Sequence, residues 1–181
     1  MGAKGILRQA TIGLLVAAAA ASASASTGIA TQTLTATLNP VGALTTPGTA
    51  SLTKSLNAFQ PFTATVPVSY QIRTTPGGSG AITLQVTHDF TPAGGPSAAS
   101  GALTYACSGA NLGTACSGTQ TASTTTQTPV LTVPAAVCTG GGGACSNQNP
   151  NTMNVTFTLT DSPVYSTGTY SVNVTFTISA M

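Results

Sequence analysis

Residues Phe62–Ile72, F-T-A-T-V-P-V-S-Y-Q-I, decide the fold class, because apolar and polar side chains alternate along them. Successive side chains of a β-strand point to opposite faces, so this period of two predicts a strand with one buried face. The same alternation returns at Ile82–His88, Met153–Leu159 and Tyr170–Ile178. Pro67 predicts that the first of these strands lies at an edge or carries a bulge, since proline cannot donate a ladder hydrogen bond.

Further strands are expected at Thr31–Leu38, Ser51–Leu56, Ala102–Ala106 and Pro129–Val133. Gly, Pro, Asn and Ser gather between the strands and predict turns or surface loops, as at Asn39–Gly48 and Gly118–Thr128. No helical period is present after residue 26. Many short strands separated by turns indicate an all-β antiparallel β-sandwich of about 7–9 strands.

The turn at Pro76-Gly77-Gly78 predicts a hairpin that joins Phe62–Ile72 to Ile82–His88. Because the even-numbered residues of both strands are apolar, Tyr70 is expected opposite Leu84 and Val66 opposite His88. In this register the His88 side chain lies at the margin of the core.

The N-terminus has the order of a secretory signal peptide: Lys4 and Arg8, then the apolar run Thr11–Ala21, then alternating Ala and Ser. The apolar run is shorter than the roughly 20 residues that a membrane span needs. We therefore expect a signal peptide at residues 1–25 and one β-sandwich domain at 27–181, with no membrane span in the mature chain. This places the protein outside the cell or on its surface, with passage through a periplasm.

Charged residues make up 3 % of the chain, against about 25 % in an ordinary soluble domain. Beyond the signal, the charged side chains are two basic and two acidic, and they sum to zero: Lys54, Arg73, Asp89 and Asp161. So few basic residues argue against a nucleic-acid partner, which requires clustered Lys and Arg. A charge near zero favours self-association.

Four cysteines fit an exported protein. Cys107 and Cys116 flank a short Gly/Asn loop, and Cys138 and Cys145 flank a Gly-rich one. Of the three connectivities that four cysteines allow, the two local disulfides are therefore favoured. No Cys-x2–4-Cys pair is present, which argues against a zinc site.

Candidates for catalysis are few, because the chain holds one His and two carboxylates. His88 and Asp89 are adjacent, but neighbouring strand residues point to opposite faces, so Asp89 is not placed to orient His88 as a base. No G-x-S-x-G motif is present. We predict a protein that is not an enzyme and that uses no cofactor or metal.

Two segments resemble a known group of surface proteins. Ser166–Ser179, S-T-G-T-Y-S-V-N-V-T-F-T-I-S, resembles the last strand of spore-coat-U-type domains and of coli-surface-antigen fimbrial subunits. Gln32–Pro40, Q-T-L-T-A-T-L-N-P, is similar to the alternating N-terminal strand of such fimbrial subunits. The resemblance implies an immunoglobulin-like sandwich that assembles into surface fibres by strand exchange.

Two functions from different classes remain open. The first is a structural or adhesive fibre subunit whose donor strand carries Leu34, Ala36 and Leu38 into a neighbouring copy, against the alternative that this strand closes its own sandwich. The second is a small module that binds carbohydrate or another ligand. Such modules stack sugars on exposed aromatic rings, for which Tyr165 is the best candidate.

Overall fold

The computed structural model describes residues 32–54, 57–137 and 150–181. The chain divides into the units Met1–Ala36 and Thr37–Met181. Residues 32–36, the described part of the first unit, contain no helix or strand. Residues 1–25 lie outside the described part, so the signal peptide stays a prediction, as does the domain boundary at residue 27.

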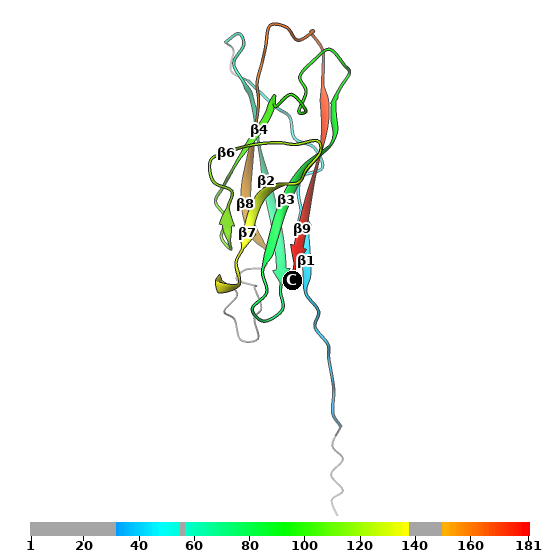
Figure 1. The fold of residues 1–181 in the computed structure, drawn as a ribbon, viewed down its shortest axis with the longest axis vertical. Coiled ribbons are helices and arrows are strands. Elements are labelled where there is room, and N and C mark those ends of the chain that lie inside the picture. Colours follow the sequence, from blue (N-terminus) through cyan, green and yellow to red (C-terminus); the bar gives the residue numbers. More distant parts are fainter. Residues whose placement is uncertain (1–31, 55–56, 138–149) are drawn as a thin grey trace, which may run out of the picture. The chain divides into compact units, whose positions relative to one another are not determined.

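The second unit is a sandwich of two antiparallel sheets (Figure 1). The first sheet has five strands, in the order β1 (Val41–Thr45), β2 (Phe62–Arg73), β8 (Asn151–Leu159), β4 (Leu103–Ser108) and β6 (Thr119–Thr121). The second has four, in the order β5 (Thr114–Ala115), β7 (Thr128–Val133), β3 (Gly80–Thr91) and β9 (Ser171–Ala180). Among the described residues there is one 3-10 turn, η1, which covers Ala135–Val137. The predicted all-β sandwich is confirmed, with nine strands among the described residues.

The core lies between the sheets and consists of the apolar residues of each alternating strand. Even-numbered residues of β2 from Val66 onward, even-numbered residues of β3 other than His88, and odd-numbered residues of β8 are buried, as the period of two predicted. Two tyrosines span the core with their hydroxyl groups satisfied: Tyr70 donates to the Leu112 carbonyl oxygen, and Tyr105 Oη lies 2.8 Å from Thr128 Oγ1. Burial raises the pKa of both phenols.

The predicted hairpin between β2 and β3 is wrong. The chain crosses from one sheet to the other between them, so β2 pairs with β1 and β8, and β3 pairs with β7 and β9. The two strands meet face to face instead: a methyl group on Gly80 would lie 2.1 Å from Cδ1 of Ile72. Alternation identifies which residues of a strand face the core. It does not tell whether two such strands are neighbours in one sheet or face each other across the sandwich.

Several strand boundaries differ from the sequence-based ones. β1 falls inside the expected turn Asn39–Gly48, whereas residues 32–40 form no strand. Within Ser51–Leu56, the described residues contribute one bridge, between Thr53 and Thr63. The expected loop Gly118–Thr128 includes β6, whose pairing with β4 draws Ala122 into the core. At β1 and β6, pairing with β2 and β4 overrides the local turn signal.

Candidate functional site

β2 pairs with β8 along one side, but among the described residues its other side has a strand neighbour along only half of its length. β1 pairs only with the C-terminal half of β2, from Val41 opposite Arg73 to Thr45 opposite Ser69. At residues 62–68 the described chain supplies just the bridge from Thr53, whose backbone exchanges hydrogen bonds of 2.9 and 2.7 Å with Thr63. Pro67 lies in this half, as expected for a residue that cannot donate to a second neighbour.

The β9 strand forms the edge of the other sheet. It pairs with β3 on one side, and among the described residues no strand pairs with its other side. Its inward-facing side chains are half-buried, whereas their partners on β3 are fully buried. These inward residues are Val172, Val174, Phe176, Ile178 and Ala180. We call β9 together with residues 62–68 of β2 the open side of the sandwich.

The open side is closed at one end only. β1 contacts β9 where the backbone of Gly42 meets Ile178, and a methyl group on Gly42 would lie 2.9 Å from Cγ1 of Ile178. A side chain at position 42 would therefore require the Ile178 side chain to shift. Towards the start of β9, Phe176 packs edge-on against buried Phe157 at a ring distance of 6.4 Å, and Phe176 and Val174 themselves stay half-buried. Apolar surface thus remains accessible there beside unpaired strand edges.

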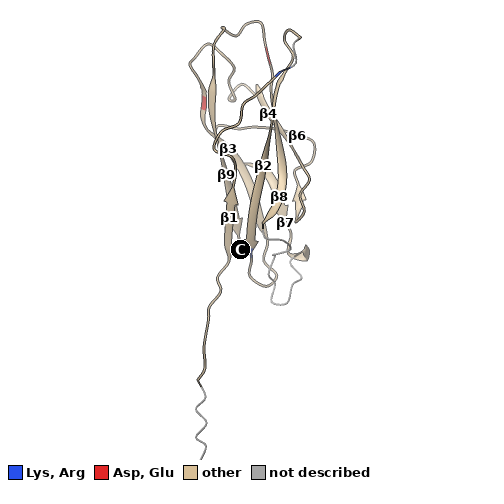
Figure 2. Cartoon of the chain, turned by 180° about the vertical axis from the view of Figure 1, so that it is seen from behind, with Lys and Arg blue, Asp and Glu red and all other residues tan. Residues whose placement is uncertain are grey.

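Charge is scarce on the open side, as Figure 2 shows for the whole unit. At the end where β2 begins, Lys54 Nζ lies 3.0 Å from Asp161 Oδ2 and 4.9 Å from the centre of the Phe62 ring. The two charges compensate each other, so the apolar surface has no net charge beside it. Strand edges are normally protected from pairing by unpaired charges, and this edge lacks that protection.

The three residues of the candidate donor strand, Leu34, Ala36 and Leu38, are all exposed. Leu34 is 87 % exposed and Leu38 is 73 % exposed. The prediction of a strand at Thr31–Leu38 is wrong for the free chain, since residues 32–38 have no strand structure. An alternating segment becomes a strand only when it pairs with another strand edge.

One of the two expected disulfides is present. Cys107 of β4 is bonded to Cys116, which follows β5, with their Cα atoms 5.3 Å apart. This bond links the two sheets at the side opposite to β9. The second expected pair, Cys138–Cys145, lies outside the described residues.

His88 and Asp89 are not arranged as a catalytic pair. His88 is exposed, so the prediction that it lies at the core margin is wrong; a bulge between Val86 and His88 shifts the alternation. Asp89 accepts hydrogen bonds from Ser97 Oγ at 2.6 Å and from the backbone of Phe90 and Ala98 at 2.8 and 2.7 Å. Desolvation alone would raise the pKa of Asp89, but these hydrogen bonds outweigh it and lower that pKa. The carboxylate therefore anchors the loop after β3 and does not orient His88.

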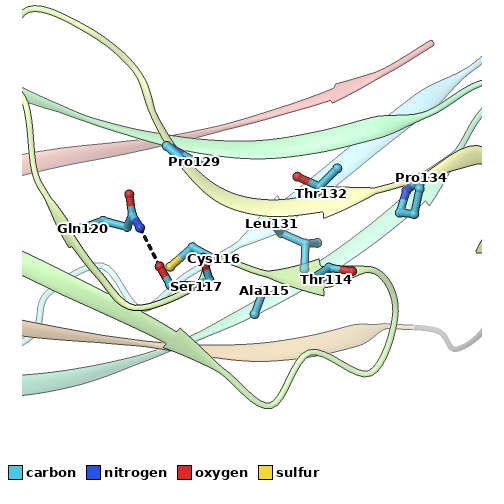
Figure 3. Close-up of a pocket in the computed structure, with 9 residues that line it drawn as sticks. All are labelled: Thr114, Ala115, Cys116, Ser117, Gln120, Pro129, Leu131, Thr132 and Pro134. Atoms are coloured by element: carbon cyan, nitrogen blue, oxygen red, sulfur yellow. Dashed lines mark hydrogen bonds between the residues drawn. The ribbon is translucent and has the colours of Figure 1, made fainter.

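Two hollows on the described part of the surface are lined by no Asp, Glu, His, Lys or Arg residue. Figure 3 shows one of about 330 Å³ between β5 and β7, lined by Cys116, Leu131 and small polar residues. Its only drawn hydrogen bond runs from Gln120 Nε2 to the Ser117 carbonyl oxygen, at 2.7 Å. Tyr165, the candidate sugar platform, is half-buried. Neither feature offers the exposed aromatic surface that stacks a sugar ring.

Within residues 32–54, 57–137 and 150–181, no three His, Cys, Asp or Glu residues gather as metal ligands would. The same residues include no helix with the length and apolar character needed to cross a bilayer. Comparison of the chain with protein-family models and with curated proteins gives no match.

Proposed function

We propose that this protein is an exported, non-catalytic structural subunit that assembles by strand exchange, with residues 32–38 of one copy pairing along β9 of the next. The observation that carries the proposal is the coexistence of an unpaired edge lined by apolar side chains and a separate exposed segment of matching alternation. Backbone hydrogen bonds would supply affinity, and alternate side chains would supply specificity.

The spacing of the two partners supports this pairing. Leu34, Ala36 and Leu38 lie on one face of an extended segment and recur every two residues, as do Val172, Val174 and Phe176 on β9. Each leucine that moves from water to an apolar site contributes about 1.5–3 kcal/mol. The absence of charge in Gln32–Pro40 removes electrostatic repulsion from the encounter.

The basic and apolar N-terminus supports export, and the cross-sheet disulfide is of the kind that oxidising compartments maintain. Assembly therefore takes place outside the cytoplasm in this proposal, at the cell surface or in the medium. The rival function, carbohydrate binding, has no comparable support, because the aromatic residue expected to carry it is half-buried.

The test compares the chain with two matched double variants. Leu34→Ser with Leu38→Ser removes both apolar anchors, while Thr33→Ser with Thr35→Ser makes equally small changes on the other face of the same segment. We expect the wild type and the threonine variant to form polymers, measured by light scattering on a sizing column and by electron microscopy. The leucine variant is expected to stay monomeric, with association weakened about a hundredfold or more.

Thermal unfolding of the leucine variant separates the two roles of the segment. An unchanged melting temperature together with lost assembly is the expected result, since Leu34 and Leu38 are exposed in the free chain. If the leucine variant unfolds, residues 32–38 stabilise the sandwich of their own chain and do not act as a donor to another copy. A wild type that remains monomeric at every concentration would refute the proposal.

A further inference from the structure

The exposed large apolar side chains of the unit Thr37–Met181 gather at its two opposite ends. We call the end where β1 begins and β9 finishes the base, and the end where β2 and β9 begin the tip (Figure 1). The base carries four such residues among those described: Leu38, Val41, Val137 and Met181. The tip carries Phe59, which is 57 % exposed, and Val164, which is 82 % exposed.

The pairing registers place these residues at opposite ends. At the base, Val41 lies opposite Arg73 and Gly80 lies opposite both Ala180 and Val133, which precedes η1. At the tip, Phe62 lies opposite Leu159 and Thr91 lies opposite Ser171. Phe59 lies shortly before the start of β2. Val164 lies in the loop that runs from the end of β8 to the start of β9.

The long faces between the two ends are polar and uncharged. On the first sheet, one row of threonines crosses four neighbouring strands in register: Thr63, Thr158, Thr104 and Thr121. The adjacent row includes Thr65 and Thr156, whose hydroxyl oxygens lie 3.0 Å apart. Such faces hydrogen-bond water readily, so they give subunits little reason to associate sideways. Apart from the open side, the large exposed apolar side chains of the described residues in this unit are confined to the base and the tip.

Phe59 has a backbone conformation that few bulky residues adopt. Its φ is 53°, in the left-handed region, while its ring projects into water. A Phe in that region is unfavourable because its Cβ crowds the following carbonyl group. An aromatic residue that is both strained and exposed fits a surface that is completed by a partner.

The link between donor segment and domain determines which ends meet. Two residues, Asn39 and Pro40, separate Leu38 from Val41 at the base, and they span about 10 Å at most. A donor antiparallel to β9 finishes at the acceptor's tip, so the base of the donor copy is held against that tip. A donor parallel to β9 would finish at the acceptor's base, where β1 already contacts Ile178.

We propose that successive subunits stack head to tail, with the base of one copy packed on the Phe59 and Val164 surface of the next. This inference rests on the proposed strand exchange and adds a second, apolar interface to it. Because base and tip are different surfaces, the contact is heterologous and propagates into an open fibre and not a closed dimer.

Cross-linking of the full chain with a short bismaleimide tests the contact. A Val41→Cys/Val164→Cys variant places one thiol at the base and one at the tip, both at exposed positions. We expect a ladder of covalent dimers, trimers and longer species on a denaturing gel. Val41→Cys alone and the control Thr119→Cys/Val164→Cys, in which Thr119 lies on the exposed long face, are expected to give the wild-type pattern.

The outcomes distinguish the two proposals. Polymers that give no ladder with Val41→Cys/Val164→Cys would overturn the end-to-end contact and leave strand exchange standing. Covalent dimers from Val41→Cys alone would show that two bases meet, which also overturns it. A chain that does not polymerise at all would overturn strand exchange and the stacking with it. A ladder that disappears when Leu34→Ser and Leu38→Ser are added would support both.

Discussion

The two long sides of the sandwich differ in how they join the sheets. On the side of β4, β5, β6 and β7, the Cys107–Cys116 bond links one sheet to the other, and Tyr105 Oη lies 2.8 Å from the Pro129 carbonyl oxygen. On the open side, β9 offers half-buried Val174 and Phe176 beside an unpaired edge. The same alternating sequence pattern therefore yields a sealed core on one side and an incomplete one on the other.

This difference has a consequence for stability and assembly. Residues of the sealed side stabilise the single chain, because their burial is already complete. In the proposed assembly, the half-buried residues of the open side would gain further burial from a partner strand and would stabilise the assembly as well as the chain. Variants that change one side while leaving the other intact can measure this division.

A matched pair of valine substitutions is expected to give the largest difference. Val130→Ala on β7 removes a fully buried side chain and should lower the free energy of unfolding by about 2–3 kcal/mol. Val174→Ala on β9 makes the same change at a half-buried position and should cost about 1 kcal/mol or less in the monomer. Chemical denaturation measures both values, and equal losses would mean that the open side is as complete as the sealed one.

Removal of the cross-sheet disulfide tests the sealed side alone. Cys107→Ser with Cys116→Ser opens a loop with a sequence separation of 9, which the loop-entropy relation converts to about 2.5 kcal/mol of lost stability. The unfolding midpoint in denaturant reports this loss. Polymerisation measured under native conditions should be unaffected, and a variant that folds but no longer assembles would contradict the independence of the two sides.

A smaller loss than that of the disulfide is expected at Asp89, whose hydrogen bonds anchor the loop after β3. Asp89→Asn should cost about 1–2 kcal/mol at neutral pH because it weakens charge-assisted hydrogen bonds to Ser97 and Ala98. The folded state lowers the pKa of Asp89 below its ordinary value of 3.8, so its contribution is complete above that pH and is lost as the pH falls through the folded value.

Unfolding curves at pH 7 and at pH 3 measure this contribution. The destabilisation caused by Asp89→Asn should shrink at the lower pH. Asp161→Asn, which removes a carboxylate from an ion pair at the surface, is the control and should cost less than about 1 kcal/mol at either pH. If the two substitutions lowered the free energy of unfolding equally, the hydrogen bonds of Asp89 would contribute no more than an ion pair at the surface.

Much of the fold follows from residue order alone. The alternation at Phe62–Ile72, Met153–Leu159 and Tyr170–Ile178 identified the long strands and the residues that face inward, since side-chain direction in a strand depends only on parity. The spacing of Cys107 and Cys116 around a short loop identified the described disulfide. Low charge identified a surface without the usual protection against association.

Which strand lies beside which was decided by the tertiary structure. Parity is identical for a hairpin neighbour and for a strand across the sandwich, so β2 and β3 could not be assigned to different sheets from the sequence. Likewise, a bulge at His88 moves a side chain from the core face to water without any local signal. The edge of β9 is open because, among the described residues, only β3 pairs with it, and no local signal in β9 indicates this. Local chemistry specifies the face of each residue, whereas pairing and closure depend on contacts between segments that are distant along the chain.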